Sequence, residues 1–87
     1  MVIIMKYFLY ILLCSDNSLY TGITPDIPKR MKAHESGKGS KYVKSRTPFT
    51  MIYSEVLADR STALKREYEI KSWSRVKKIK VLNLKFD

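Results

Sequence analysis

The chain has 87 residues and a formal net charge of +9 at pH 7, because 17 Lys and Arg residues outnumber 8 Asp and Glu residues. With 45% hydrophobic and 29% charged residues, the composition excludes a disordered chain and a protein of several domains, and it predicts one soluble domain with a modest core. The excess positive charge attracts polyanions, which favours nucleic acid as the partner over an acidic membrane face or an acidic protein.

The apolar start of the chain, MVIIMKYFLYILLC, resembles a secretory signal segment. Lys6 divides its apolar residues, whereas a secretory segment has its positive charge first and then an unbroken apolar stretch. No apolar run approaches the roughly 18 residues that cross a bilayer, and the single cysteine, Cys14, has no partner for an internal disulfide or a metal site. We therefore expect a protein of the reducing cytoplasm that does not enter a membrane.

Two apolar runs near the start of the chain predict a β-hairpin. Residues 5–14 form a nearly continuous apolar run of strand length, which indicates a central strand covered on both faces. The residues SDN at 15–17 are turn formers. Residues 18–24, SLYTGIT, are β-prone and are predicted to return as a second strand.

The length of the hairpin loop decides which side chains share a face. A two-residue turn pairs Leu13 with Tyr20 and places Tyr10 and Tyr20 on opposite faces. A three-residue loop pairs Tyr10 with Gly22 and places both tyrosines and the glycine on one face. The sequence leaves both registers open, but we favour the three-residue loop because Asn17 suits the left-handed position that it requires.

The segment TPDIPKRMKAHESG, residues 24–37, has the pattern of a helix. Its end signals are Thr24 or Asp26 as the N-cap, Pro28 in the first turn and Gly37 at the end. Arg30 and His34 are four residues apart in this helix, so they are expected to project from the same side.

The rest of the chain predicts a basic loop, a third strand and two further helices. The segment GKGSKYVKSRTP, residues 37–48, is a basic loop with room for one short helical turn, and residues 49–57, FTMIYSEVL, alternate well enough for a strand. A second helix, DRSTALKREYEIKSW, begins near Asp59, and a third covers residues 74–84 with Ser74 as its cap.

One carboxylate of the second predicted helix falls in an unexpected place. The apolar arc of this helix consists of Ala63, Leu64, Tyr68 and Ile70. Glu67 falls in the middle of that arc, whereas Glu69 points nearly the opposite way. A buried carboxylate is costly unless it forms an ion pair or binds a metal. Both explanations stay open, because Mg²⁺ often takes only one or two protein carboxylates and completes its shell with water and substrate phosphate.

The other candidate residues also have ordinary structural explanations when each is taken alone. Tyrosines on strands usually serve in packing, and Arg30 can be a solvated helix residue. His34 is the single histidine, so it has no companion for a zinc site. Gly22 can mark a β-bulge. The arrangement of these residues argues for function more strongly than any one of them does.

Four segments in order resemble the GIY-YIG nuclease domain. The residues YIL at 10–12 and YTGIT at 20–24 are similar to the paired signature of that family. Arg30, ten residues after Tyr20, matches the arginine of the family's helix, and ALKRE, ending at Glu67, is similar to its metal-binding glutamate segment. The resemblance covers about residues 6–75 and is closest to small stand-alone bacterial members.

The resemblance implies an α+β fold, with a three-stranded antiparallel sheet flanked by three helices in a ββααβαα-like order and a single domain over residues 1–87. It also implies metal-dependent cleavage of nucleic-acid phosphodiester bonds with one divalent cation, Mg²⁺ or Mn²⁺, and a role in DNA repair or processing. DNA is favoured over RNA. Two rivals are a nucleic-acid-binding module of the same fold with weak or no cleavage, and a basic protein that docks on a larger nuclease, a ribosome or an acidic partner.

The resemblance also implies roles for the residues that match the family's motifs. Tyr20 would be the general base or would orient the attacking water, and Tyr10 would support that water or the scissile phosphate. Arg30 would neutralise charge on the transition-state phosphate, a task that suits a guanidinium fork. His34 would bond a phosphate or assist proton transfer.

Glu67 would hold the metal, and Gly22 would let the backbone approach the substrate. The exposed basic residues that we expect to contact phosphates, besides a cluster at residues 75–80, are Lys29, Lys32, Lys38, Lys41, Lys44 and Arg46. The sequence departs from the family signature at Phe8, which stands where the first triplet has its glycine, and at Thr21, which is expected to face away from Tyr20. Asn83 is the one late candidate for a site asparagine that many members carry.

Overall fold

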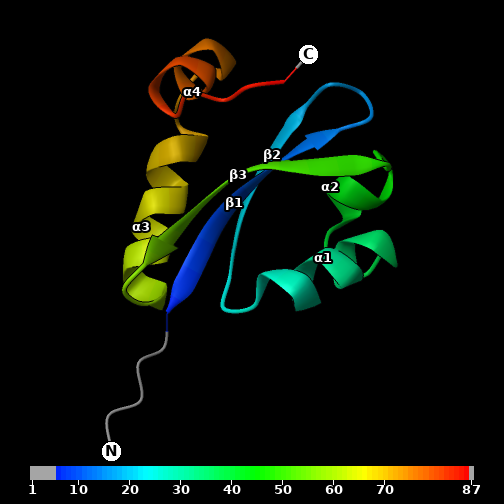
Figure 1. Ribbon diagram of the computed structural model, residues 1–87, viewed down its shortest axis with the longest axis horizontal. Coiled ribbons are helices and arrows are strands. Elements are labelled where there is room, and N and C mark those ends of the chain that lie inside the picture. Colours follow the sequence, from blue (N-terminus) through cyan, green and yellow to red (C-terminus); the bar gives the residue numbers. More distant parts are fainter. Residues whose placement is uncertain (1–5, 87) are drawn as a thin grey trace, which may run out of the picture.

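The computed structural model describes residues 6–86 of the chain (Figure 1). Its elements, in chain order, are β1 Tyr7–Cys14, β2 Leu19–Thr24, α1 Ile27–Glu35, α2 Lys41–Lys44, β3 Phe49–Leu57, α3 Arg60–Lys71 and α4 Arg75–Val81. The strands form one sheet in the order β2-β1-β3, and both pairings are antiparallel. The predicted α+β class with a three-stranded antiparallel sheet is therefore confirmed.

The central strand β1 is covered on both faces, as its continuous apolar run predicted. Leu9, Tyr10, Ile11 and Leu12 are all at most 1% exposed. Side chains of a strand alternate between faces, so this one strand contributes to two separate cores. In Figure 1, α3 and α4 lie on one side of the sheet and α1 and α2 on the other. Residue 5, the predicted start of this strand, lies outside the described residues.

The hairpin has the register of the three-residue loop. Tyr10 pairs with Gly22 and Leu12 with Tyr20, so both tyrosines and the glycine share a face. Asn17 has a φ of 68°, the left-handed conformation for which an asparagine is suited. The favoured register is therefore confirmed, and it brings the two tyrosines to the same side of the sheet.

The helix ends follow the capping signals of the sequence. Three side-chain oxygens accept hydrogen bonds from the first turns of α1, α3 and α4; they belong to Asp26, Asp59 and Ser74. Gly37 has a φ of 80° just after α1, a conformation in which a side chain would be strained. Helix α4 ends at Val81, earlier than predicted, and Asn83 follows it with a φ of 54°.

Two features differ from the sequence prediction. The basic segment 37–48 contains the four-residue helix α2, so residues 6–86 form four helices and the short helical turn that we allowed for is a defined element. The predicted apolar arc of α3 is wrong at two positions, because Leu64 is 39% and Tyr68 81% exposed. Only Ala63 and Ile70 of that helix are fully buried, so the stripe that α3 buries is narrower than its apolar arc.

None of the helices within residues 6–86 has the length and apolar character needed to cross a membrane.

Candidate active site

A buried hydrogen bond between a tyrosine and a histidine forms the centre of the site. The hydroxyl of Tyr10, on β1, lies 2.8 Å from Nε2 of His34, on α1. Tyr10 is 1% exposed and His34 is 0% exposed. The two residues are 24 positions apart in the chain, so the packing of α1 on the sheet brings them together. Arrangements of this kind are uncommon in a core because both groups lose their hydration.

Gly22 makes the room that the Tyr10 phenol occupies. A Cβ atom at this position would lie 2.5 Å from the Tyr10 hydroxyl oxygen and 2.6 Å from Cζ. Any side chain at residue 22 would therefore displace the phenol from His34. This is the observed reason for the glycine, whereas approach of a substrate to its backbone stays a prediction.

Tyr20 lies beside the buried pair and is more accessible. Its ring centroid is 6.3 Å from that of Tyr10 and 5.5 Å from that of His34. The side chain is half-buried, whereas the other two are enclosed. The register of the hairpin and the packing of α1 thus bring three of the predicted site residues into one cluster, with Tyr20 at its border.

Two opposite charges act on the Tyr10 phenol. Burial raises the pKa of Tyr10 well above that of a free phenol, the neighbouring Tyr20 and Glu67 raise this pKa further, and Arg30 opposes the shift. Arg30 belongs to α1 and Glu67 to α3, so charges from two helices act on the same phenol. Tyr10 therefore keeps its proton at neutral pH and serves as a hydrogen-bond donor or acceptor.

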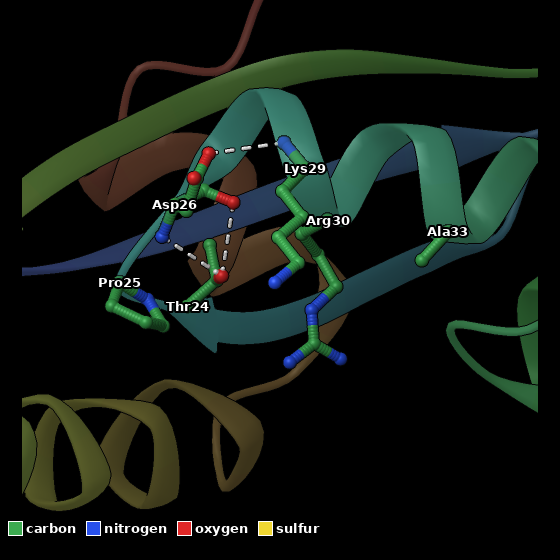
Figure 2. Close-up of a pocket in the computed structure, with 6 residues that line it drawn as sticks. All are labelled: Thr24, Pro25, Asp26, Lys29, Arg30 and Ala33. Carbon is green, nitrogen blue, oxygen red and sulfur yellow. Dashed lines mark hydrogen bonds between the residues drawn. The ribbon is translucent and has the colours of Figure 1, made fainter.

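Arg30 also lines an open cleft of about 590 Å³. The other lining residues are Thr24, Pro25, Asp26, Lys29 and Ala33. Figure 2 shows the side chains of Lys29 and Arg30 extending from the α1 backbone, whereas a carboxylate oxygen of Asp26 turns back to accept the bond from the Lys29 N–H. The ion pairs found among residues 6–86 include neither Lys29 nor Arg30, so both cations are available to an anionic ligand.

His34 is held as a neutral imidazole. Burial lowers its pKa, and the positive charge of Arg30 lowers that pKa further. Its Nδ1 atom is buried without a hydrogen-bond partner among the described residues. Gly39 packs against this edge of the ring, because a Cβ there would lie 2.6 Å from Nδ1. The histidine is thus enclosed by its neighbours and contacts Tyr10, not solvent.

Glu67 is half-buried, with 20% of its side chain exposed, and its Oε2 lies 3.4 Å from Nζ of Lys71. This geometry is compatible with both explanations that the sequence left open, an ion pair and a metal ligand. The contact with Lys71 is long for an ion pair, and the carboxylate still reaches solvent. Within residues 6–86 no three His, Cys, Asp or Glu side chains are grouped as metal ligands. A single carboxylate fits a hard cation such as Mg²⁺ that takes its other oxygens from water and substrate phosphate.

The predicted phosphate contacts fall into two groups. Five are exposed side chains on α1, α2 and the segment between them: Lys29, Lys32, Lys38, Lys41 and Lys44. Arg46 differs, because its Nε donates to Asp16 Oδ2 at 2.8 Å and its side chain is 33% exposed. Asn83 lies after α4, and its left-handed conformation accounts for its presence at the end of that helix.

One aromatic residue of this region was missed by the sequence analysis. Tyr42, on α2, stacks on Tyr20 with ring centroids 5.8 Å apart and an interplanar angle of 27°. Its position could not be inferred, because the sequence predicted a basic loop with room for one short helical turn but not where that turn packs. The only signal was the tyrosine itself within a run of basic residues.

Comparison with known proteins places these residues in a family. The GIY-YIG catalytic domain matches residues 6–80, which include all of the candidate site. The chain therefore belongs to the GIY-YIG nuclease family.

Within that family the chain is similar to small proteins designated UPF0213. One from Staphylococcus saprophyticus is 50% identical over 78 residues, which cover 90% of this chain and 95% of that protein. One from Staphylococcus haemolyticus is 47% identical over 77 residues, which cover 88% and 94% of the two chains. These relatives consist almost wholly of this domain.

Two solved structures have the same fold. The solution NMR structure of a UPF0213 protein from Bacillus halodurans is 42% identical, with a TM-score of 0.60 over 91% of this chain and 84% of that one. The solution NMR structure of a protein from E. faecalis is 36% identical, with a TM-score of 0.66 over 90% and 83%.

Proposed function

We propose that this protein is a metal-dependent endonuclease that cleaves phosphodiester bonds of nucleic acid. The observation that carries the proposal is the buried Tyr10–His34 hydrogen bond next to a more accessible tyrosine, where the charges of Arg30 and Glu67 both act on the Tyr10 phenol. Nothing in the packing of a small domain requires this set of polar groups. Membership of the nuclease family supports the same conclusion.

The two tyrosines have different tasks in this proposal. Tyr20 is half-buried and can meet a water molecule, so we assign it the orientation or deprotonation of the attacking water. Tyr10 is enclosed, and burial raises its pKa, so it stays protonated and positions Tyr20 or a substrate oxygen through its hydroxyl. His34 has no exposed surface; it acts through Tyr10 and is a positioning residue.

Arg30 and Glu67 provide the charges that phosphoryl chemistry needs. The Arg30 guanidinium in the open cleft would bind the scissile phosphate and stabilise the charge that develops on it. Glu67 would hold a divalent cation, which supplies charge neutralisation at the phosphate when it is bound. The exposed lysines of α1 and α2 would contact neighbouring phosphates.

A binding module without cleavage is the alternative function. The net charge of +9 would suffice for binding, since phosphate contacts alone give sequence-independent affinity. Binding alone does not need an imidazole and a phenol enclosed together, and this favours cleavage. We infer that DNA is favoured over RNA as the substrate, and that the protein acts in DNA repair or processing in the cytoplasm.

A cleavage assay on a panel of substrates tests the proposal. Single-stranded, duplex and branched DNA and RNA are incubated with the protein in Mg²⁺, in Mn²⁺ and in EDTA, and Glu67→Ala protein is assayed in parallel. We expect cleavage of at least one substrate with a cation present, and none in EDTA or with the variant. Binding without cleavage of any substrate by the wild-type protein would establish the alternative, and cleavage that survives in EDTA would contradict the metal requirement.

A further inference from the structure

Tyr20 is in contact with a second element besides the sheet on which it lies. The Tyr42 ring of α2 stacks on it with centroids 5.8 Å apart. Tyr42 is 37% exposed, so it forms an outer layer over the half-buried Tyr20. The helix that carries it has four residues, and an element so short does not fix a side chain by its own stability. The orientation of Tyr42 must therefore come from other contacts.

Arg46 supplies those contacts. Its guanidinium carbon lies 3.7 Å from the centre of the Tyr42 ring, well within the range of a cation–π interaction. Its Nη1 donates to the Tyr42 carbonyl oxygen at 3.0 Å and to Ser45 Oγ at 3.1 Å. Arg46 thus fixes both the backbone and the ring of Tyr42.

Asp16 connects this arginine to the hairpin that carries Tyr20. Arg46 Nε donates to Asp16 Oδ2 at 2.8 Å, while the Ser18 N–H donates to Asp16 Oδ1 at 3.1 Å. The Ser15 N–H also donates to the Arg46 carbonyl oxygen at 2.9 Å. The bonds from Ser18 and from Arg46 hold the pKa of the Asp16 carboxyl below its usual range, so the carboxylate stays charged. The loop of the β1–β2 hairpin and the segment at the end of α2 are therefore joined by hydrogen bonds.

We propose that Asp16, Arg46 and Tyr42, which we name the clamp, position the Tyr20 ring for cleavage. The inference rests on the proposed function, because it assigns these residues a part in the reaction through Tyr20. A hydroxyl that must align a water molecule with a phosphorus atom tolerates little displacement, and an error of about 1 Å can lower a rate by roughly 10²-fold. Stacking on one face of Tyr20 removes the freedom of its ring to tilt away from His34 and Tyr10.

The role of Arg46 in the clamp differs from the phosphate contact that the sequence suggested for it. A phosphate contact acts on affinity and releases counterions, so its loss lowers the slope of log affinity against log salt by about 0.9 on duplex DNA. A positioning residue acts on the bound complex, so its loss lowers kcat and leaves KM and the salt slope unchanged. The Nε and Nη1 atoms and the face of the Arg46 guanidinium already have partners within the protein.

The experiment uses three variants that break the clamp: Arg46→Gln, Asp16→Asn and Tyr42→Leu. Two variants are controls: Tyr42→Phe keeps the stacked ring, and Lys85→Gln removes an exposed cation outside the clamp. Circular dichroism establishes that each variant is folded before its kcat, KM and salt slope are measured. We expect kcat to fall about 10- to 100-fold in the first three, at unchanged KM and salt slope. Tyr42→Phe and Lys85→Gln should retain the wild-type kcat.

A spectroscopic measurement keeps the clamp testable apart from cleavage. In wild-type protein, nuclear Overhauser contacts should join the Tyr20 ring to the His34 ring, whose centroids lie 5.5 Å apart. We expect these contacts to weaken in Arg46→Gln and Tyr42→Leu and to persist in Tyr42→Phe. Unchanged contacts in the first two variants would overturn the clamp, as would an Arg46→Gln effect confined to KM and the salt slope. Wild-type protein that keeps the contacts but cleaves nothing would instead refute the proposed function.

Discussion

The two faces of β1 bury side chains of similar size but of different chemistry. On one face the buried residues of the cluster are aliphatic: Leu9, Ile11, Ile70 and Leu84. On the other face the same strand buries Tyr10, whose hydroxyl is bonded to an enclosed His34. The first face gains stability from every carbon that it removes from water, at about 25 cal/mol per Å². The second face has to bury two polar groups as well.

That difference indicates which face serves in function. Burial of a hydroxyl or an imidazole costs about 1–3 kcal/mol unless a hydrogen bond compensates it. One hydrogen bond joins the Tyr10 hydroxyl to Nε2 of His34, yet Nδ1 of His34 has no hydrogen-bond partner among residues 6–86. The aliphatic face also buries a polar atom, the Thr21 hydroxyl oxygen, which has no hydrogen-bond partner among residues 6–86, but the buried residues of its cluster include no phenol and no imidazole. We therefore attribute the polar face to chemistry and the aliphatic face to stability.

The largest effect should follow from removing one hydroxyl on the polar face. Tyr20→Phe keeps the ring that stacks on Tyr42 and deletes the group that aligns water, so the single-turnover rate should fall by at least about 10²-fold, the usual scale of a general base. The melting temperature should stay close to that of the wild type. Tyr7→Phe, on the same sheet but outside the site, is the matched control. Wild-type cleavage by the Tyr20→Phe protein would remove this tyrosine from the mechanism.

A substitution on the aliphatic face should show the reverse pattern. Ile70 is 0% exposed, so Ile70→Ala should lower the free energy of unfolding by about 2–5 kcal/mol, measured by urea denaturation. The rate per folded molecule should be unchanged. Leu64→Ala, on the same helix but 39% exposed, should lower the free energy of unfolding by less than about 1 kcal/mol. If Ile70→Ala abolished cleavage in protein that remains folded, the two faces could not be treated as separate.

The pH dependence of stability should reveal that His34 is enclosed as a neutral imidazole. Burial and the charge of Arg30 lower the pKa of His34 in the folded protein, so below the ordinary value near 6.5 the unfolded chain binds a proton more readily than the folded one. Stability should be complete above that pH and should decline as the pH falls toward the lowered pKa. Urea denaturation between pH 7.5 and 5 measures this decline, which His34→Gln should abolish. A wild-type stability that is flat over this range would show that the imidazole can be protonated in place.

The smallest effect should come from a single exposed cation of the cleft. Lys29 lines the cleft together with Arg30, and Lys29→Gln should lower the slope of log affinity against log salt by about 0.9 on duplex DNA. The kcat should stay the same. Lys85→Gln is the control for the loss of one positive charge, and an equal change in both variants would mean that the field of the whole molecule, not the cleft, determines binding.

The sequence predicted the features of the fold that depend on neighbouring residues. The register of the hairpin followed from Asn17, and the helix starts followed from capping side chains such as Asp26 and Asp59. These features arise from short-range hydrogen bonds and sterics, which a short sequence segment specifies. The family motifs then brought Tyr10 and His34 into the predicted site before their contact was known.

The rest depended on contacts between distant segments. The enclosure of His34 requires Gly39 and the β1 tyrosine to meet around one ring, and the internal contacts of Arg46 require a partner 30 residues away. Helical periodicity located the apolar stripe of α3 but overestimated its width, since the sheet covers only Ala63 and Ile70. A pattern along the chain does not reveal how far a neighbouring element extends.

The most direct test of the account compares two glutamates of α3. Glu67 is 20% exposed and lies 3.4 Å from Lys71, whereas the side chain of Glu69 is 55% exposed and contacts Arg66. The measurement is the melting temperature without divalent cations, together with cleavage in Mg²⁺, for Glu67→Gln and for Glu69→Gln. We predict that Glu67→Gln loses cleavage but melts like the wild type and still binds nucleic acid, while Glu69→Gln keeps cleavage. A Glu67→Gln protein that melts far below the wild type would show that this carboxylate is a structural partner of Lys71, and would contradict its role at the metal.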